Sequence, residues 1–546
     1  MSDLGVPNDF IASYKDYQSY PKCIIDRAKY GGALLEEYDG RLLERSEALN
    51  LFVEHDVYIP YREIGKDHRV IEEILWSDAD VSSYLTDPSD LRSVPGSSGD
   101  PVFRTISLIT AGSTQPLETT RESLKRILAY FQVMPEFLEF LYIFGRRDGL
   151  DSELRSSGFR TDVALSEPNP AHIIKSLNRS GRRYQMCYSL KSVSINKDLD
   201  EKAHGHGQWK IRNAAFHHQF DVEAHTQLWV LGDQKVKLHT LLGTQLAKGQ
   251  RYPERFGTFQ QAFETSLDTH LLYCRSACQD WRWFICSMED KIQDLTIHCL
   301  LPPRTNGENP IIWDPEGVRI LQQEEERVNA TIMALKSNLG IITRLVKFFR
   351  SLVKNPGFPE KEASEQSVFD FTSRLEELTY DLESQISRAQ ILSKLVTDRK
   401  NMLIQHLQIQ TVVQQERVAH AMGLEAIAVR VIAVITLVFL PATFVSTFFS
   451  TDVIKFQPDD EVKSGSPPQQ YSSRALKMFF AVSIPLMAIT FGIAIGWYWF
   501  ERRQKRMKYE RIQLDGKDLE DSYTDSARLR FPWKYWKRGR IPSKSL

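Results

Sequence analysis

The pattern of hydrophobic and polar positions divides the chain into a long mixed part and two uncharged apolar stretches near its C-terminal end. The apolar stretches cover residues 431–449 and 478–500. A helix rises about 1.5 Å per residue, so each stretch is close to the ~20 residues that cross a hydrocarbon core of about 30 Å. We therefore expect a large water-exposed body joined to a membrane hairpin of two helices.

Before residue 310 the pattern mixes helix and strand signals. Apolar residues at helical spacing predict short amphipathic helices at 116–131 and 135–144, and Ser, Gly and Pro at 93–101 predict a loop or linker. From Gly257 onward the pattern turns helical. Alternating or continuous apolar runs predict strands at 102–110, 184–190, 210–220 and 227–231.

After Pro315 the pattern is helical almost without interruption. One helix is predicted over 315–353, where two prolines and a glycine at 355–359 end it. A second helix begins near Ser364 and meets only Gly423 and Pro441 before residue 449, so it should continue into the first membrane segment and could carry motion there. Spacings of three and four indicate a packed, coiled-coil-like seam along it, at Val368, Phe371, Leu375, Leu378 and Leu382.

Charge gives the expected topology. Lys plus Arg number 69 and Asp plus Glu 70, so the global charge indicates neither a nucleic acid nor an acidic substrate. Basic residues favour the cytoplasmic side of a membrane, and they follow the second apolar stretch directly. Two crossings then place both termini in the cytoplasm. The N-terminus resembles no presequence, which favours the plasma membrane or vacuole over mitochondria. The basic residues are Arg502, Arg503, Lys505, Arg506 and Lys508.

These patterns predict an α+β cytoplasmic domain, a long α-helical stalk and two C-terminal transmembrane helices. The expected boundaries are a mixed domain at 1–310, a stalk at 311–425, a first transmembrane helix at 426–450, an extracytoplasmic loop at 451–477, a second transmembrane helix at 478–500 and a basic cytoplasmic tail at 501–546.

The first membrane segment carries a stripe of hydroxyl side chains. At 100° per residue its members fall within roughly 40° of one face, and Glu425 projects onto the same face. If several copies surround an axis, such a stripe can replace the hydration water of a passing cation. Small hydroxyl residues also let helices pack closely, which is the alternative explanation. The hydroxyl stripe consists of Thr436, Thr443, Thr447 and Ser450.

Other candidate sites are less specific. Zinc needs three or four converging ligands, and His217 and His225 could face each other across a hairpin turning at 221–224. Strand histidines satisfied by hydrogen bonds are the alternative. The histidine group is His204, His206, His217, His218 and His225.

Cys274 and Cys278 share a helix face, and we expect buried free thiols. No P-loop, GxGxxG, GxSxG or HExxH motif is present, so no enzyme is predicted.

The run Phe439-Leu440-Pro441-Ala442-Thr443-Phe444-Val445 resembles the first membrane helix of the CorA-type magnesium transporters, which carries a similar FLPxTF run. The order of mixed domain, stalk helix, two crossings and basic tail agrees with that family. Segment 211–230 is similar to fungal members, through Arg212, Phe216, Trp229 and the run Phe220-Asp221-Val222-Glu223.

The resemblance implies a homopentamer in the bilayer, with the first membrane helix lining the pore and the second facing lipid. It also implies Mg²⁺ or another divalent cation as both the transported and the regulatory ion, with no covalently bound cofactor. A cytoplasmic funnel would close when the ion binds between subunits. The acidic runs at 324–326 and 376–377 would then be either solvated helix faces or part of that cation sensing.

The sequence departs from the family where the helix should end in Gly-Met-Asn at the outer mouth. Those positions are Ser450, Thr451 and Asp452 here, which puts magnesium selectivity and transport itself in question. A ring of Asp452 carboxylates could bind a metal ion and concentrate cations, but it would repel itself unless protonated or occupied. The alternative is a solvated acidic loop.

Two functional hypotheses remain from the sequence. The first is an oligomeric divalent-cation channel or transporter with Glu425 and the hydroxyl stripe along the permeation path and Asp452 at its mouth. The second is a non-transporting scaffold or sensor, derived from the same fold, for which the hairpin is only an anchor. A pentamer favours the first hypothesis, and a monomer or dimer favours the second.

Overall fold

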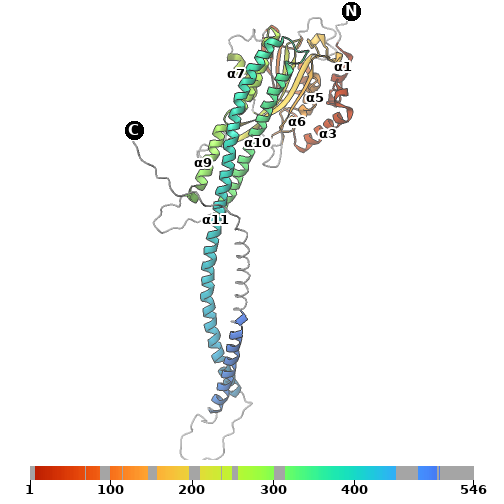
Figure 1. The fold of residues 1–546 in the computed structure, drawn as a ribbon. Coiled ribbons are helices and arrows are strands. Elements are labelled where there is room, and N and C mark those ends of the chain that lie inside the picture. Colours follow the sequence, from red (N-terminus) through yellow and green to blue (C-terminus); the bar gives the residue numbers. More distant parts are fainter. Residues whose placement is uncertain are drawn as a thin grey trace, which may run out of the picture. The chain divides into compact units, whose positions relative to one another are not determined.

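The computed structural model describes residues 6–67, 69–85, 99–112, 115–145, 157–195, 209–234, 237–248, 256–300, 314–450, 477–500 and 503–504. The chain divides into two compact units, Met1–Gln410 and Thr411–Leu546. Figure 1 shows the first unit as a sheet covered by helices. The predicted domain boundaries at 310 and 425 stay predictions.

A seven-stranded mixed sheet forms the centre of the first unit. Its strand order is β2-β1-β3-β7-β6-β5-β4. Among the pairs that the described strands form, β3 and β7 run parallel and the others antiparallel. The strands are β1 Ile59–Ile64, β2 Val70–Leu75, β3 Phe103–Thr110, β4 Phe159–Ala164, β5 Arg183–Ile195, β6 Trp209–Asp221 and β7 Thr226–Gln234.

The four predicted strands are confirmed as β3, β5, β6 and β7, with β5 and β7 longer than expected. The sequence analysis did not predict β1, β2 or β4. The predicted loop at 93–101 lies mostly outside the described residues, and residues 99–101 have no regular structure.

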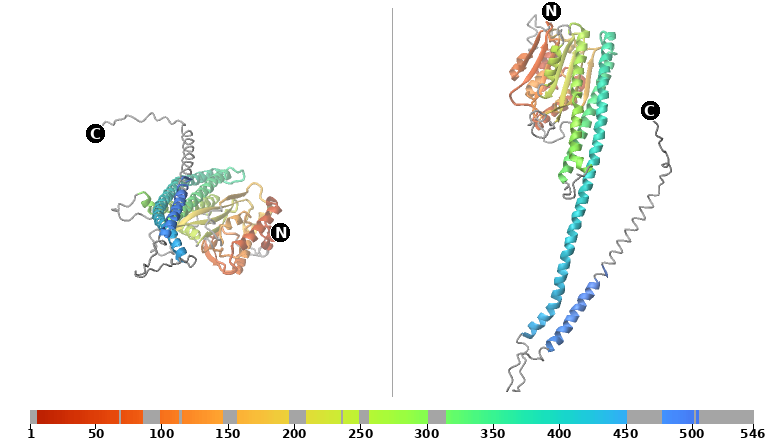
Figure 2. Two further views of the ribbon diagram at one scale, coloured as in Figure 1. Left: turned by 90° about the horizontal axis from the view of Figure 1, so that it is seen from below. Right: turned by 90° about the vertical axis from the view of Figure 1, so that its left-hand side faces the viewer.

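N-terminal helices cover one face of the sheet (Figure 2). Ile127 and Leu128 of α5 belong to the same buried cluster as Ile106 of β3 and Val230 of β7. The two predicted helices in this layer are confirmed with shorter bounds. The layer consists of α1 Asn8–Lys15, α2 Arg27–Tyr30, α3 Gly32–Ala48, α4 Asp78–Tyr84, α5 Arg121–Tyr130 and α6 Phe137–Leu141, with short 3-10 turns η1 Tyr17–Ser19, η3 Pro170–His172 and η4 Lys175–Leu177.

Later helices cover the opposite face. Alternation along β5 separates the two layers, because Tyr188 joins the cluster under these helices whereas Cys187 joins the other. Phe216 of β6 stacks on Tyr188, and Trp229 of β7 belongs to the same larger cluster. The elements in this part of the chain are α7 Lys237–Lys248, α8 Phe259–Cys278, α9 Trp281–Leu300 and α10 Pro315–Leu352.

The two long helices agree closely with the prediction. Asp314 caps α10 by accepting a hydrogen bond from the Glu316 backbone at 3.0 Å, and Pro315 occupies the first turn. The next helix, α11, runs from Lys361 to Ser450 without a break. The predicted seam is buried at Val368, Phe371, Leu375 and Leu382, and Leu378 is partly buried. The fold class predicted from the sequence is therefore confirmed.

The acidic run on α10 is only partly solvated. Glu324 is 1% exposed and binds Lys291 of α9 at 2.5 Å. Glu325 is paired with Lys400 of α11. The solvated-face alternative therefore does not hold for these two residues, whereas Glu326 is exposed. Glu376 is exposed and pairs with Arg350 at 2.8 Å, as an ordinary surface ion pair does.

Asn338 of α10 completes the edge of β5. Strand β4 pairs only with Arg183–Tyr188, so Lys191 lies beyond its end. The Asn338 amide accepts a hydrogen bond from the Lys191 backbone N–H at 2.8 Å and donates one to its carbonyl at 2.6 Å. Asn338 is fully buried. One side chain thus takes the place of a neighbouring strand.

Replacing Asn338 by leucine should lower the free energy of unfolding by about 2–4 kcal/mol, because two buried backbone groups lose their partners. Chemical denaturation of the solubilised protein would measure this loss. The matched control is Lys336→Gln at a nearby exposed position of the same helix, which should change stability by less than about 0.5 kcal/mol. Equal stability of Asn338→Leu and the control would contradict the bridging role.

Candidate functional site

The hydroxyl stripe lies on the last part of α11. Thr436, Thr443, Thr447 and Ser450 are all exposed in the single chain, as is Glu425. Thr436 Oγ1 donates to the Ala433 carbonyl at 2.9 Å, and Thr443 Oγ1 lies 3.0 Å from the Phe439 carbonyl and 2.9 Å from that of Leu440. Because the hydroxyl protons of Thr436, Thr443 and Thr447 are held by their own helix, the outward sides of these three oxygens offer lone pairs.

The buried side of this segment faces away from the stripe. Pro441 and Val445 are buried in the chain, and both lie about 160° around the helix from Thr443. The second apolar helix, Lys477–Phe500, is buried at Ser483. The hydroxyl face therefore stays open in one copy, which fits both predicted alternatives, a wet pore lining and a close helix contact. Thr451 and Asp452 lie outside the described residues.

The histidines do not gather as a metal site. His204 and His206 lie outside the described residues. The β6–β7 register sets His217 opposite Val230, and the turn between Asp221 and Thr226 contains His225. The predicted facing pair of His217 and His225 is therefore wrong. Within the described ranges, no three His, Cys, Asp or Glu side chains could hold a metal ion together.

Hydrogen bonds satisfy part of this histidine group instead. His218 Nδ1 lies 3.0 Å from His270 Nε2, and His270 Nδ1 lies 2.8 Å from the Tyr188 hydroxyl. The His218 ring stacks on Trp229 with centroids 4.1 Å apart. Burial lowers the pKa of His270 to about 3 and that of His218 well below its usual value. Both rings are therefore neutral parts of the core at pH 7.

The cysteines follow the expectation of free thiols. Cys274 is buried and Cys278 half-buried on α8, and both are free. Burial raises the pKa of the Cys274 thiol well above its usual value. A buried neutral thiol is a poor nucleophile and a poor metal ligand.

Ser107, His239 and Glu72 form a hydrogen-bonded chain that was not predicted from the sequence. Ser107 Oγ lies 3.1 Å from His239 Nδ1, and His239 Nε2 lies 3.2 Å from Glu72 Oε1. These residue types occur in serine hydrolases. Ser107 is only 1% exposed, however, so a substrate has no access to its hydroxyl in this conformation.

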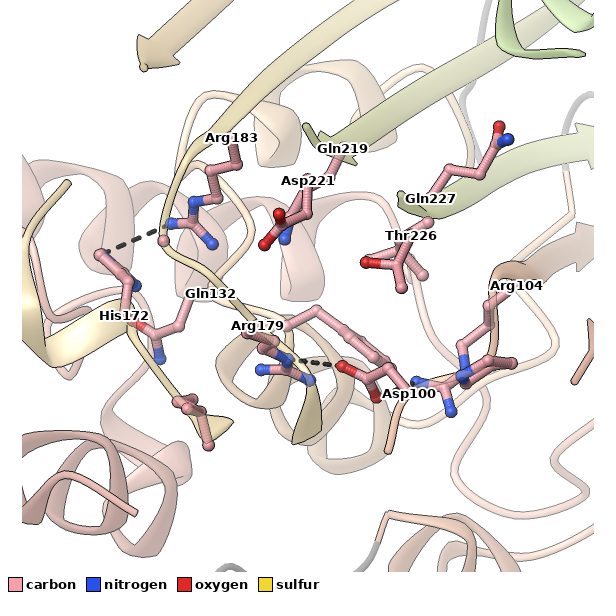
Figure 3. A pocket seen from close by; sticks show the side chains of 15 residues that line it. Asp100, Arg104, Gln132, His172, Arg179, Arg183, Gln219, Asp221, Thr226 and Gln227 are labelled. Carbon is pink, nitrogen blue, oxygen red and sulfur yellow. Dashed lines mark hydrogen bonds and ion pairs between the residues drawn. The ribbon is translucent and has the colours of Figure 1, made fainter. Parts of the chain in front are cut away.

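A second polar site, which we call the arginine pocket, lies where several strands begin or end at one edge of the sheet (Figure 3). Arg183 begins β5, Asp221 ends β6, Thr226 begins β7, and Arg104 lies at the start of β3. Arg179 comes from the segment that precedes β5. The parallel β3–β7 pair and the antiparallel β5–β6–β7 hairpins bring these positions to the same edge.

Ion pairs hold one side of the arginine pocket. Asp100 is shared by Arg104 Nη1 at 3.1 Å and Arg179 Nε at 2.6 Å, and Arg104 Nε also binds Glu63 at 2.6 Å. Asp221 accepts hydrogen bonds from the Ser180 backbone N–H at 2.8 Å and hydroxyl at 2.5 Å. The cavity between these side chains has a volume of about 40 Å³.

The family model for CorA-like transporters matches residues 12–300, which include the whole sheet and the arginine pocket. The chain belongs to the CorA-like transporters. This confirms the resemblance on which the sequence analysis relied. Two described helices, Lys361–Phe448 and Lys477–Phe500, are long and apolar enough to cross a membrane. As a CorA-like protein with these two helices, the chain is an integral membrane protein.

Comparison with solved structures gave distant similarities. The CorA magnesium transporter of Methanocaldococcus jannaschii is 11% identical with a TM-score of 0.35, over 80% of this chain and 97% of that one. The ZntB cytoplasmic domain of Vibrio parahaemolyticus is 6% identical with a TM-score of 0.29, over 63% of this chain and 99% of that one. The comparison with curated proteins gave no match.

Proposed function

We propose that this CorA-like protein conducts divalent cations across a membrane through an oligomeric pore lined by α11. The observation that carries the proposal is the open hydroxyl face of Thr436, Thr443, Thr447 and Ser450, opposite the buried positions Pro441 and Val445. Hydroxyl oxygens in this arrangement can replace part of a cation's hydration shell. Membership in a transporter family supports the same conclusion.

The finer features of the proposal follow the predicted topology. The protein is a homo-oligomer, a pentamer by family resemblance, with both termini in the cytoplasm of a plasma or vacuolar membrane. Glu425 lies on the same face as the hydroxyl stripe and lines the cytoplasmic end of the path. The outer mouth is formed by Ser450, Thr451 and Asp452, and Mg²⁺ or another divalent cation passes there and regulates opening.

Asp452 offers the first test at the mouth. In liposomes that contain the purified protein, Mg²⁺, Mn²⁺, Co²⁺ and Zn²⁺ influx would be followed with dyes enclosed in the vesicles. We expect flux above that of protein-free liposomes, and Asp452→Ala should reduce influx at low cation concentration about three- to tenfold by removing the negative ring. The matched control is Asp459→Ala, farther along the same acidic loop.

The absence of flux for all four ions would contradict the proposal. It would favour the alternative, a membrane-anchored scaffold or sensor that does not transport. The replacement of Gly-Met-Asn by Ser450, Thr451 and Asp452 is the specific observation in favour of that alternative. The mass of the solubilised particle separates the two further, because a pore needs several copies around one axis whereas an anchor functions as a monomer or dimer.

A further inference from the structure

We propose that the arginine pocket binds a small tetrahedral oxyanion of the phosphate class between Arg179 and Arg183. The proposal concerns the sheet domain and does not depend on cation transport. Three guanidinium groups, those of Arg104, Arg179 and Arg183, line this one cavity (Figure 3).

The Arg179 guanidinium has a buried donor without an acceptor. Its Nε binds Asp100 at 2.6 Å, and its Nη1 donates to the Tyr130 carbonyl at 2.9 Å. Its Nη2 is buried and has no hydrogen-bond partner among the described residues. A buried cationic donor that lacks an acceptor is costly, and a bound anion would remove that cost.

Arg183 has carboxylates near it, those of Asp26, Asp162 and Asp221, but forms an ion pair with none of them. Its side chain is 7% exposed, and in the described parts of the chain it forms no ion pair with a carboxylate. Nearby carboxylates are engaged elsewhere. Asp162 is paired with Lys29, and Asp26 binds Asn169 and His172. Asp221, which lies opposite Arg183 in the strand register, accepts hydrogen bonds from Ser180. Burial lowers the pKa of Arg183, which is the expected effect of desolvating a cation without enough negative charge around it.

His172 cannot supply the missing acceptor. Its Nε2 lies 2.8 Å from Asp26 Oδ2 and 3.5 Å from Arg183 Nη2. Burial lowers the pKa of His172 to about 4, so the ring is neutral at pH 7. The Nε2 proton is then donated to Asp26, and the same nitrogen has no lone pair left for Arg183. The Arg183 fork therefore has no strong acceptor on this side of the pocket.

The size of the cavity selects the ligand. A volume of about 40 Å³ holds about three water molecules, which is comparable to the oxygens of one tetrahedral anion. Guanidinium forks match the geometry of phosphate oxygens. Gln219 Oε1, also at the pocket, is buried without a partner and can accept a hydrogen bond from a P–OH group, which sulfate does not have at pH 7.

The test uses the full-length protein in detergent, dialysed free of phosphate. Phosphate, sulfate and chloride are added at equal ionic strength, and thermal unfolding and calorimetric titration are recorded. We expect saturable binding of phosphate and weaker binding of sulfate. Phosphate should raise the melting temperature by about 2 °C or more, and the other anions should raise it less or not at all.

The key variant is Arg183→Gln, with Arg182→Gln as its matched control, because Arg182 is the exposed neighbour of Arg183. In phosphate-free buffer Arg183→Gln should be as stable as the wild type or more stable, since it removes a buried charge without a partner. Phosphate should then stabilise the wild type and Arg182→Gln but leave Arg183→Gln unchanged.

Equal phosphate shifts in the wild type and Arg183→Gln would overturn the proposal, because they would show a general salt effect. Titration of the wild-type protein without saturable heat would overturn it too, and that readout remains if Arg183→Gln does not fold. A third outcome would also overturn the proposal. This is an experimental density map of the phosphate-soaked wild type that shows only water between Arg179 and Arg183.

Discussion

Leucine at position 443 should reduce cation influx into proteoliposomes at least about tenfold. Thr443 lies at the centre of the hydroxyl stripe and inside the family-like run at 439–445. Each copy would lose one oxygen ligand where the ion is partly dehydrated, and losing such a partner costs about 1–3 kcal/mol, whereas about 1.4 kcal/mol already corresponds to a tenfold change. The bulkier apolar side chain would also narrow and dewet the path.

The control for this prediction is Val434→Leu. Val434 is exposed like Thr443 but lies about 180° from it around the helix. The substitution Val434→Leu therefore introduces the same side chain into the same helix, away from the proposed path. Cation flux should stay within about twofold of the wild type. Equal flux from both variants would show that the stripe is a helix-packing surface. Size-exclusion profiles of both variants must match the wild type, so that a loss of flux is not a loss of assembly.

Acidification from pH 7 to pH 5 should destabilise the sheet domain by at least about 4 kcal/mol. Burial lowers the pKa of His217 and of His270 to about 3, and it lowers the pKa of His218 further. An unfolded histidine has a pKa of about 6.5, so below that pH the unfolded chain binds more protons than the folded one. The stabilising contribution is complete above about pH 6.5 and falls by about 2 kcal/mol per histidine down to pH 5.

Protonation of Asp233 changes the free energy of unfolding in the opposite direction. Burial raises the pKa of its carboxyl to about 6, so the folded state takes up this proton before the unfolded state does. Its protonation returns about 1.4 kcal/mol at pH 5 and offsets part of the histidine effect. Carboxylates of ordinary or lowered pKa lose their contribution only at lower pH. Between pH 7 and pH 5 the buried histidines therefore outweigh the opposing carboxyl groups of raised pKa.

Chemical denaturation at pH 7, 6 and 5, followed by tryptophan fluorescence, would measure the effect. His217→Gln keeps a donor for Gln185, which His217 Nε2 contacts at 3.1 Å, and should reduce the stability loss by about 2 kcal/mol. The matched control His55→Gln changes an exposed histidine and should leave the loss as it is in the wild type. Unchanged or rising stability at pH 5 would contradict the neutral, buried state of these rings.

The sequence predicted most of the strands that are buried on both faces; the exception is β1, which is buried but carries Pro60, Arg62 and Glu63 in its six residues. Strands β3, β5, β6 and β7 lie in the middle of the sheet, so their apolar runs are long and unambiguous. Strand β2 lies at the edge, where Ile71 and Glu72 are exposed, and β4 is short with Arg160 and Thr161 exposed. Such strands carry little periodic signal, because half of their positions face water or a charged partner.

The arginine pocket could not be predicted from spacing. Arg104 and Arg183 are far apart in the sequence, and only the strand order brings them to one edge of the sheet. One local signal was available, because Arg182 and Arg183 open a strand whose following residues are strongly apolar. A charged residue at the start of a buried strand is unusual, but the sequence does not show which other side chains lie beside it.

The histidine group shows that residues close together in the sequence need not lie together in the fold. Five histidines within a short stretch suggested a metal site, yet side-chain direction in a strand alternates from one residue to the next. His217 points to the cluster that contains α6, where its ring contacts Phe137, and His218 points to His270 of α8. Neighbours in the sequence were therefore separated by the sheet itself.

The parallel pair of β3 and β7 has a consequence for synthesis of the protein. Strand β3 is made early, but its partner on one side is complete only at Gln234. While the nascent chain is shorter than this, Ile106 and Leu108 cannot be buried in a complete sheet. The unpaired edge of β3 can then pair with strands of other chains. Most of the first 234 residues must therefore emerge from the ribosome before this domain can fold. Fragments that end before β7 should be insoluble.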